Sequence, residues 1–200
     1  MHLPAGGVVR GVTPVRWTLL LDPAGRPGWQ NMALDQALLD LADAEGRSFL
    51  RLYRWMPHCL SLGRNEPALR RYDREALEQR GLDAVRRPTG GRAVWHADEL
   101  TYSVATPCSA FGTPAASYHA IHEMLAGAVR TLGAPARIAP APARVAALDA
   151  GACFASPAGG EVMVGDRKVV GSAQLRQGSA LLQHGSLLLG GSQEVVTALT

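Results

Sequence analysis

Cysteine, aromatic side chains and long apolar runs are all scarce in this chain of 200 residues. Its three cysteines form no Cys-x-x-Cys pair, and this odd, scattered set argues against a disulfide framework and a structural zinc site. No apolar stretch reaches the length of a membrane-spanning helix, and the first residues lack the charged-then-apolar order of a secretory signal. The 47% of hydrophobic and 18% of charged residues exclude a disordered chain. We expect one globular cytoplasmic domain that contacts no membrane.

A strong charge of either sign is also missing, since the net charge is +3 and the sequence pI is about 9.0. The basic residues are nevertheless clustered. Arg70, Arg71 and Arg74 lie on one expected helix, and Arg86 and Arg87 follow shortly afterwards. The cluster is either an ordinary solvated surface or a patch that attracts an acidic protein or a phosphate-bearing substrate. Few aromatic residues accompany it and no recognition motif is present, which argues against nucleic acid.

Apolar residues change between helical and strand spacing along the chain, which predicts an α+β domain with a mixed β-sheet and flanking helices. Residues 1–16 are expected to form an N-terminal arm and 22–28 a loop, while 134–149 show no clear pattern. We expect helices at 29–44, 67–79 and 116–132, the first with Asn31 as its N-cap. We expect strands at 17–21, 49–55, 59–62, 82–87, 100–106, 161–164, 167–174 and 180–189. The last three are predicted to form a meander.

The segment Arg86-Arg-Pro-Thr-Gly-Gly-Arg-Ala-Val-Trp-His96 is the first candidate site. Adjacent glycines let the backbone approach a ligand closely and turn its amides toward negative oxygens. Arg87 could add a charge-assisted contact to a carboxylate, a phosphate or a phosphopantetheine group. The alternative is an ordinary turn between two strands.

A second candidate is the segment from Gly165 to Gln174, which contains Lys168. A lysine in such an apolar, strand-forming stretch keeps its charge only beside an anionic partner. The small residues Gly171, Ser172 and Ala173 suit a strand that lines a narrow pocket. The alternative is an exposed lysine on a hairpin.

The cysteines divide into two kinds. Cys153 lies in a loop, where a nearby lysine would lower its pKa and make it a nucleophile suited to a thioester. The alternative is an inert loop thiol. Cys59 and Cys108 are interpreted as small core residues.

Four histidines are also notable. His119 and His122 are one helical turn apart, but no third ligand lies at a useful spacing, so we expect no metal site. His96 and His184 lie inside the distinctive segments, and His184 is expected to organise hydrogen bonds in a pocket.

Taken together, these segments resemble the lipoate–protein ligase and octanoyltransferase superfamily. The matching segments are Asn31-Met-Ala-Leu-Asp-Gln, Leu60-Ser-Leu-Gly-Arg64, residues 86–94, Leu100-Thr-Tyr-Ser-Val, residues 165–174 and Gln183-His-Gly-Ser-Leu-Leu-Leu. They cover most of residues 17–190. The resemblance implies a biotin/lipoate-ligase-like catalytic domain over residues 17–200. Family members usually continue into a helical C-terminal region, which we expect to be missing here.

The resemblance also implies an acyl-binding pocket in which Lys168 faces the acyl carbonyl. The substrate-binding residues expected from these segments are Arg87, Gly90, Gly91, Arg92, Ala93, Val94, Trp95, His96, Gly171, Ser172, Ala173 and His184.

Within the superfamily, Cys153-Phe154 ahead of the turn at 165–166 is similar to the octanoyltransferases of the LipM type. That similarity implies an enzyme that takes octanoyl from acyl carrier protein onto Cys153 without a cofactor. It then passes the octanoyl group to a lysine of a lipoyl domain or of glycine cleavage H protein. Lys168 is expected to lower the thiol pKa and to stabilise the oxyanion. Ala158, Gly159 and Gly160 replace the hydroxyl and aromatic residues that are usual in the family, which implies a looser loop.

Two alternatives stay open. One is an ATP- and magnesium-dependent lipoate or octanoate ligase, in which Arg87 and the glycine loop hold the adenylate phosphate. The other is a non-catalytic homologue that only binds an acylated carrier or serves as half of a two-part enzyme.

Overall fold

A computed structural model describes residues 16–67, 72–140 and 159–197 of the protein. The expected nucleophile Cys153 and the basic residues Arg70 and Arg71 lie outside these ranges, as do most residues of the expected N-terminal arm.

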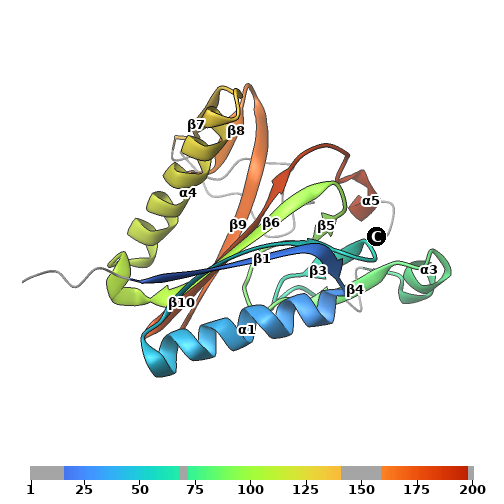
Figure 1. The fold of residues 1–200 in the computed structure, drawn as a ribbon. Helices are drawn as coiled ribbons and strands as arrows, with labels where there is room; N and C mark the ends of the chain where they lie inside the picture. The colour runs from blue at the N-terminus through green and yellow to red at the C-terminus, as the bar shows by residue number, and fades with distance from the viewer. Residues whose placement is uncertain (1–15, 68–71, 141–158, 198–200) are drawn as a thin grey trace, which may run out of the picture.

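The larger of two sheets has seven strands in the order β1-β2-β6-β10-β9-β8-β7 (Figure 1). Its strands are β1 (Trp17–Arg26), β2 (Ser48–Trp55), β6 (Glu99–Pro107), β7 (Ala136–Ile138), β8 (Val162–Val164), β9 (Arg167–Gln177) and β10 (Ala180–Leu188). The smaller sheet has the order β4-β3-β5, from β3 (Cys59–Leu62), β4 (Asp83–Arg86) and β5 (Val94–His96). The remaining elements are α1 (Gly28–Glu45), α3 (Arg74–Gln79), η1 (Cys108–Ala110), α4 (Pro114–Thr131) and α5 (Glu194–Thr197).

Both sheets are mixed. In the larger sheet β1 and β2 are parallel, and in the smaller sheet β3 and β4 are parallel, whereas the other pairs are antiparallel. Parallel neighbouring strands need a crossover connection. α1 lies in the crossover from β1 to β2, and α3 lies in the crossover from β3 to β4. The predicted α+β class with a mixed sheet is confirmed, and so is the meander of β8, β9 and β10.

The two long helices cover opposite faces of the larger sheet (Figure 1). On β6, Ala105 belongs to the core cluster under α1, whereas Tyr102 and Val104 belong to the cluster under α4. Alternate residues of a strand point to opposite faces, so the central strands β2, β6, β9 and β10 contribute side chains to both cores. In α1 the buried residues Leu38, Leu39 and Ala42 form the apolar stripe that the helical spacing predicts.

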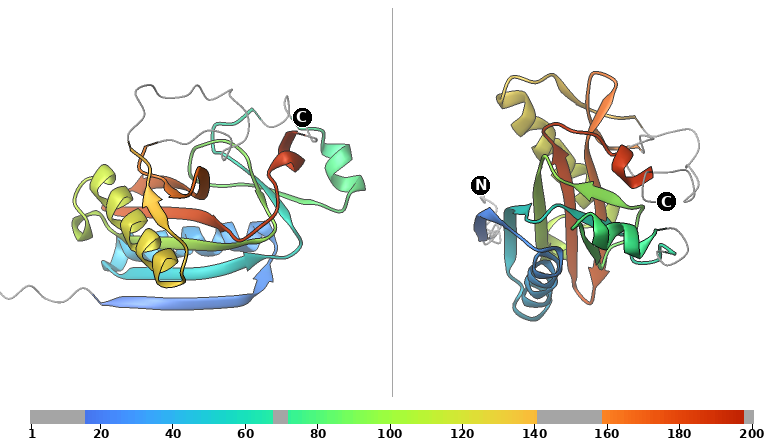
Figure 2. Two further views of the ribbon diagram at one scale, coloured as in Figure 1. Left: turned by 90° about the horizontal axis from the view of Figure 1, so that it is seen from above. Right: turned by 90° about the vertical axis from the view of Figure 1, so that its right-hand side faces the viewer.

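A third cluster lies between the smaller sheet, α3 and α5, with Leu60, Leu77 and Trp95 among its buried members. Figures 1 and 2 show these elements gathered at one end of the larger sheet, while β7, β8 and α4 lie toward the other end. The strands that carry the glycine loop are therefore set against the middle of the larger sheet.

Several expected boundaries were wrong. The proposed loop at 22–28 is largely strand, because β1 runs to Arg26. α1 begins at Gly28 with Pro27 as its N-cap, so Asn31 lies inside the helix and does not cap it. Cys108 is only partly buried in η1 and is no core residue. No helix in the described ranges is both long and apolar enough to cross a membrane.

The expected helix at 67–79 begins, among the described residues, only at Arg74. The side chain of Asp73 caps it by accepting hydrogen bonds from the amides of Glu75 and Ala76. The unassigned stretch after 134 contains the short edge strand β7, which the sequence pattern did not reveal.

Candidate functional site

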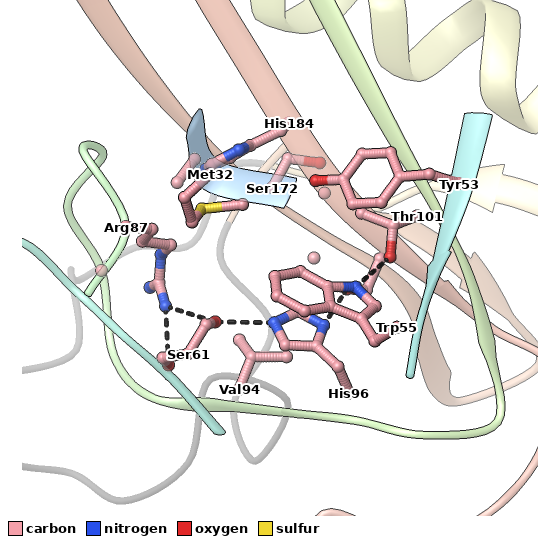
Figure 3. Close-up of a pocket in the computed structure, with 15 residues that line it drawn as sticks. Met32, Tyr53, Trp55, Ser61, Arg87, Val94, His96, Thr101, Ser172 and His184 are labelled. Carbon is pink, nitrogen blue, oxygen red and sulfur yellow. Dashed lines mark hydrogen bonds between the residues drawn. The ribbon is translucent and has the colours of Figure 1, made fainter. Parts of the chain in front are cut away.

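A pocket opens where the smaller sheet meets the face of the larger sheet that α1 covers (Figure 3). It holds about 440 Å³ of empty space, counting the solvent at its mouth. Its lining residues are Met32, Tyr53, Trp55, Ser61, Arg87, Gly91, Val94, His96, Thr101, Gly171, Ser172, Ala173, His184, Gly185 and Ser186.

Side chains alternate between the two faces of a strand, and this alternation determines which of the predicted substrate-binding residues line the pocket. In β5, Val94 and His96 line the pocket, while Ala93 and Trp95 belong to the third core cluster behind it. The expectation that residues 93 and 95 bind substrate is therefore not supported, because neighbours on a strand face opposite ways. Gly90 and Arg92 are also absent from the lining and act through their carbonyl groups, as described next.

Arg87 is a structural anchor of the glycine loop. It is 6% exposed, and its side chain donates to the Gly90 and Arg92 carbonyl oxygens and to the Ser61 carbonyl and hydroxyl. These five contacts match the five N–H groups of a guanidinium. Its charge thus holds the loop in shape, which differs from the expected direct contact with a ligand carboxylate or phosphate.

Two glycines permit close backbone contacts around the pocket. A Cβ on Gly63, just after β3, would lie 1.8 Å from the carbonyl oxygen of Gly91. A Cβ on Gly185 would lie 2.4 Å from the carbonyl oxygen of Gly171 on the neighbouring strand. Both distances are far below van der Waals contact, so these positions require glycine.

A chain of hydrogen bonds crosses one side of the pocket from Glu99 through His96 to Ser61. Figure 3 shows its second step, between His96 and Ser61. Glu99 Oε1 lies 2.7 Å from His96 Nδ1, and His96 Nε2 lies 2.6 Å from Ser61 Oγ. A carboxylate only accepts, so Nδ1 donates to Glu99 and Nε2 is left to face the Ser61 hydroxyl. Trp55 stacks on the imidazole with 4.0 Å between the ring centroids, which fixes its orientation.

A second chain runs from Asp35 on α1 through His184 on β10 to Thr89 of the glycine loop. His184 Nδ1 lies 2.9 Å from Asp35 Oδ2, and its Nε2 lies 2.7 Å from Thr89 Oγ1. The buried Asp35 also accepts from the guanidinium of Arg51 and from Tyr53. The expectation that His184 organises hydrogen bonds in the pocket agrees with this geometry.

Asn31 belongs to the same buried network. Its side chain accepts from Arg51 and donates to the carbonyl oxygens of Arg26 and Arg54. It thereby joins the start of α1 to β1 and β2, which explains a buried asparagine inside a helix.

Lys168, at the start of β9, is not among the residues that line this pocket, and the nearest lining residue of its strand is Gly171. Lys168 is buried, and its Nζ lies 2.6 Å from Glu161 Oε1. Val162 pairs with Val170 but Met163 pairs with Lys168, so a register shift interrupts the strand period at this lysine. The anionic partner that a buried lysine requires is thus Glu161.

The remaining expectations concern thiols and metals. Cys59 is fully buried, and its desolvation and the neighbouring Asp83 raise the pKa of its thiol far above the usual value. His122 is buried against Ser172 and the carbonyl of Gly160, while His119 is exposed. No group of three metal-ligating side chains occurs within the described part of the chain.

Sequence reasoning missed seven lining residues: Met32, Tyr53, Trp55, Ser61, Thr101, Gly185 and Ser186. Five of them, at positions 32, 61, 101, 185 and 186, lie inside segments that carry the family resemblance. Choosing alternate residues of each such strand would have found part of this set.

Comparisons with known proteins agree with this architecture. A family model described as the lipoyl protein ligase A/B catalytic domain matches residues 27–200. The octanoyltransferase LipM of Kyrpidia tusciae is 44% identical over 192 residues, which cover 92% of this chain and 69% of that protein. The octanoyltransferase LipM of Moorella thermoacetica is 42% identical over 183 residues, which cover 88% and 66%. The chain thus spans about two thirds of the length of these relatives.

Among solved structures, a lipoate-protein ligase A bound with ATP superposes with a TM-score of 0.74 at 23% identity, over 94% of this chain and 71% of that one. A bi-partite lipoate protein ligase from Thermoplasma acidophilum gives a TM-score of 0.68 at 23% identity, over 92% and 66%. These structures share the fold. The family model and the two relatives show that the chain belongs to the family of lipoyl protein ligase A/B catalytic domains.

Proposed function

We propose that this chain is an acyltransferase that moves octanoyl from acyl carrier protein to a lysine of a lipoyl domain. The observation that carries the proposal is the identity of 40–44% to several octanoyltransferases over most of the chain. The pocket supports it, because small residues of β9 and β10 line a space for an acyl chain, and the same strand β9 carries the buried Lys168 three residues before Gly171. Glycine cleavage H protein is a further acceptor of the same kind.

The reaction has two steps. The Cys153 thiolate attacks the thioester carbonyl, the bond from carbon to the donor sulfur breaks, and the donor thiol takes up the proton. The acceptor lysine amine then attacks the Cys153 thioester, an amide forms, and the cysteine thiol is regenerated with the proton that the amine loses. Neither step requires ATP or another cofactor.

Lys168 supplies positive charge to this chemistry. An ammonium near the thiol lowers its pKa, and one near the carbonyl stabilises the oxyanion of each tetrahedral intermediate. Glu161 is the carboxylate partner of Lys168 in its buried position, with 2.6 Å between Oε1 and Nζ.

The experiment is mass spectrometry of the protein mixed with octanoyl carrier protein in the absence of ATP. We expect an octanoyl adduct on the parent and none on Cys153→Ala, which should also lose transfer to a lipoyl domain. Cys108→Ala is the matched control, because Cys108 lies away from the pocket lining, and it should retain both properties. Near-normal transfer by Cys153→Ala, or transfer only with ATP, would favour the ligase.

A further inference from the structure

Four residues on neighbouring strands form a row across the sheet side of the pocket, and all four line it. The row consists of Gly171 on β9, Ser186 on β10, Thr101 on β6 and Tyr53 on β2. Each member pairs in register with the next, and directly opposed residues of an antiparallel pair point to the same face of the sheet. Neighbouring strands lie about 4.8 Å apart, so the row is about 14 Å long. An extended ligand can therefore lie across four strands.

The hydroxyl groups in this row already have partners within the protein. Thr101 and Ser186 both donate to Oε1 of the buried Glu99, at 2.5 Å and 2.8 Å. Their hydroxyl protons are therefore not available to a ligand. Met32 of α1 adds a flexible apolar side chain to the same lining. The row thus suits an alkyl chain.

Two aromatic residues of β2, Tyr53 and Trp55, lie at the end of this row (Figure 3). Tyr53 is 1% exposed and Trp55 is 4% exposed, with 5.9 Å between their ring centroids. The Tyr53 hydroxyl donates to Asp35 at 2.9 Å, and the Trp55 indole N–H donates to Thr101 at 2.7 Å. These hydrogen bonds hold both rings in place, so the rings close the pocket at β2.

The two rings differ in what lies behind them. Beyond Tyr53 the row continues with Asp22 on β1, whose carboxylate pairs with Arg51 at 3.1 Å. An alkyl chain gains nothing beside such a charged pair. Trp55 instead belongs to an apolar core cluster with the buried Cys59. A smaller side chain at position 55 should therefore lengthen the apolar space, whereas a smaller one at position 53 would uncover charged groups.

We infer that Tyr53 and Trp55 set the longest acyl chain that this enzyme accepts, with Trp55 as the specificity-determining residue, an inference that rests on the proposed function. The thioester lies at the β9 end of the row, on the strand that carries Lys168, and the methyl end of the chain points toward β2. An extended octanoyl group spans about 9 Å between its terminal carbons, given about 1.5 Å for each bond of the zigzag. It fits a row of about 14 Å, whereas a dodecanoyl group is as long as the whole row and would meet the rings.

The test measures transfer from donors of different chain length. The donors are the octanoyl, decanoyl and dodecanoyl thioesters of N-acetylcysteamine, given to the whole chain with a lipoyl domain as acceptor. Trp55→Leu should raise the ratio of kcat/KM for decanoyl to that for octanoyl about tenfold, because each methylene group that gains an apolar site contributes a factor of about four. Trp55→Phe, which keeps an aromatic ring and disturbs the fold less, should shift the ratio in the same direction by a smaller factor.

Trp95→Leu is the matched control. Trp95 is 7% exposed in the core cluster behind β5 and does not line the pocket. Its replacement removes the same volume from a core but should leave the ratio as in the parent.

Calorimetry with free octanoate, decanoate and dodecanoate measures the chain-length preference without catalysis. We expect the parent to bind octanoate most tightly and Trp55→Leu to bind decanoate more tightly than the parent does. An unchanged ratio in both Trp55 variants, or an equal shift in Trp95→Leu, would overturn the inference. Failure of the parent to transfer any of the acyl groups would refute the proposed function instead, and calorimetry would still test the role of the two rings.

Discussion

At the scale of single residues, the planar guanidinium of Arg87 stabilises the glycine loop more through the directions of its N–H groups than through its charge. Its N–H groups are directed at Ser61, Gly90 and Arg92, three points that a lysine ammonium cannot reach together. We therefore expect Arg87→Lys to lower kcat/KM for octanoyl transfer about tenfold or more and to reduce the free energy of unfolding by about 2 kcal/mol. Enzyme kinetics and urea unfolding measure the two effects.

The control for this variant is Arg80→Lys, at an exposed position after α3, which should change neither quantity. If Arg87 acted only as a positive charge on a bound anion, Arg87→Lys would retain most of the activity. That result would contradict the anchoring role.

At the scale of elements, His122 joins α4 to β9 and to the segment before β8. Its Nδ1 donates to the Gly160 carbonyl oxygen, and its Nε2 lies 2.7 Å from Ser172 Oγ. Desolvation lowers the pKa of this imidazole, and the charge of Lys168 adds to the effect. Below about pH 6.5 the unfolded chain binds a proton that the folded chain resists. Stability from this group is thus complete above that pH and falls as the pH drops toward the lowered folded value.

We expect the free energy of unfolding of the parent to fall more between pH 7.5 and pH 5.5 than that of His122→Gln. Urea unfolding at the two pH values gives this difference directly. His58→Gln is the control, because His58 is exposed and is not among the groups that lower the pKa of His122, so this variant should keep the pH dependence of the parent. An identical pH dependence in His122→Gln and the parent would exclude His122 as the group responsible.

At the scale of the whole molecule, the hydrogen bond between Thr89 and His184 links the glycine loop of the smaller sheet to the larger sheet. Thr89→Val keeps the shape of the side chain but removes its hydroxyl and leaves a buried imidazole nitrogen without its partner. The variant should lose about 1–3 kcal/mol of stability, and the amides of the glycine loop should exchange hydrogen faster. Denaturant unfolding and hydrogen-exchange mass spectrometry measure these effects.

Thr131→Val is the matched control, because its hydroxyl bonds only within the exposed end of α4. It should leave exchange in the glycine loop as in the parent, and Thr89→Ser should restore the parent behaviour. Unchanged exchange in Thr89→Val would mean that other contacts, such as those of Arg87, hold the loop without this link.

The sequence by itself determined the fold class, the family and most helices and strands of this protein. These features depend on local patterns: apolar spacing in α1 and α4, alternation of apolar and polar residues in β6, and glycines at turns. The same patterns identified Lys168 as a lysine that needs an anionic partner, because its neighbours are apolar. The prediction that Asn31 caps α1 was wrong because its side chain bonds with β1 and β2 instead. Local sequence does not show such partners.

Only the tertiary structure decided which side chains share the pocket. Pairing of β9 with β10 and of β3 with β5 brings Gly171, His184, Ser61 and His96 together across long stretches of chain. The strand period sends Trp95 into a core although it lies between two lining residues, and the register shift at Lys168 interrupts that period. Ser61, Glu99 and Asp35 are recognised as members of the site only through the hydrogen bonds that they form with its histidines. Such partners are fixed by register and by packing between sheets, which depend on the whole chain and not on any one segment.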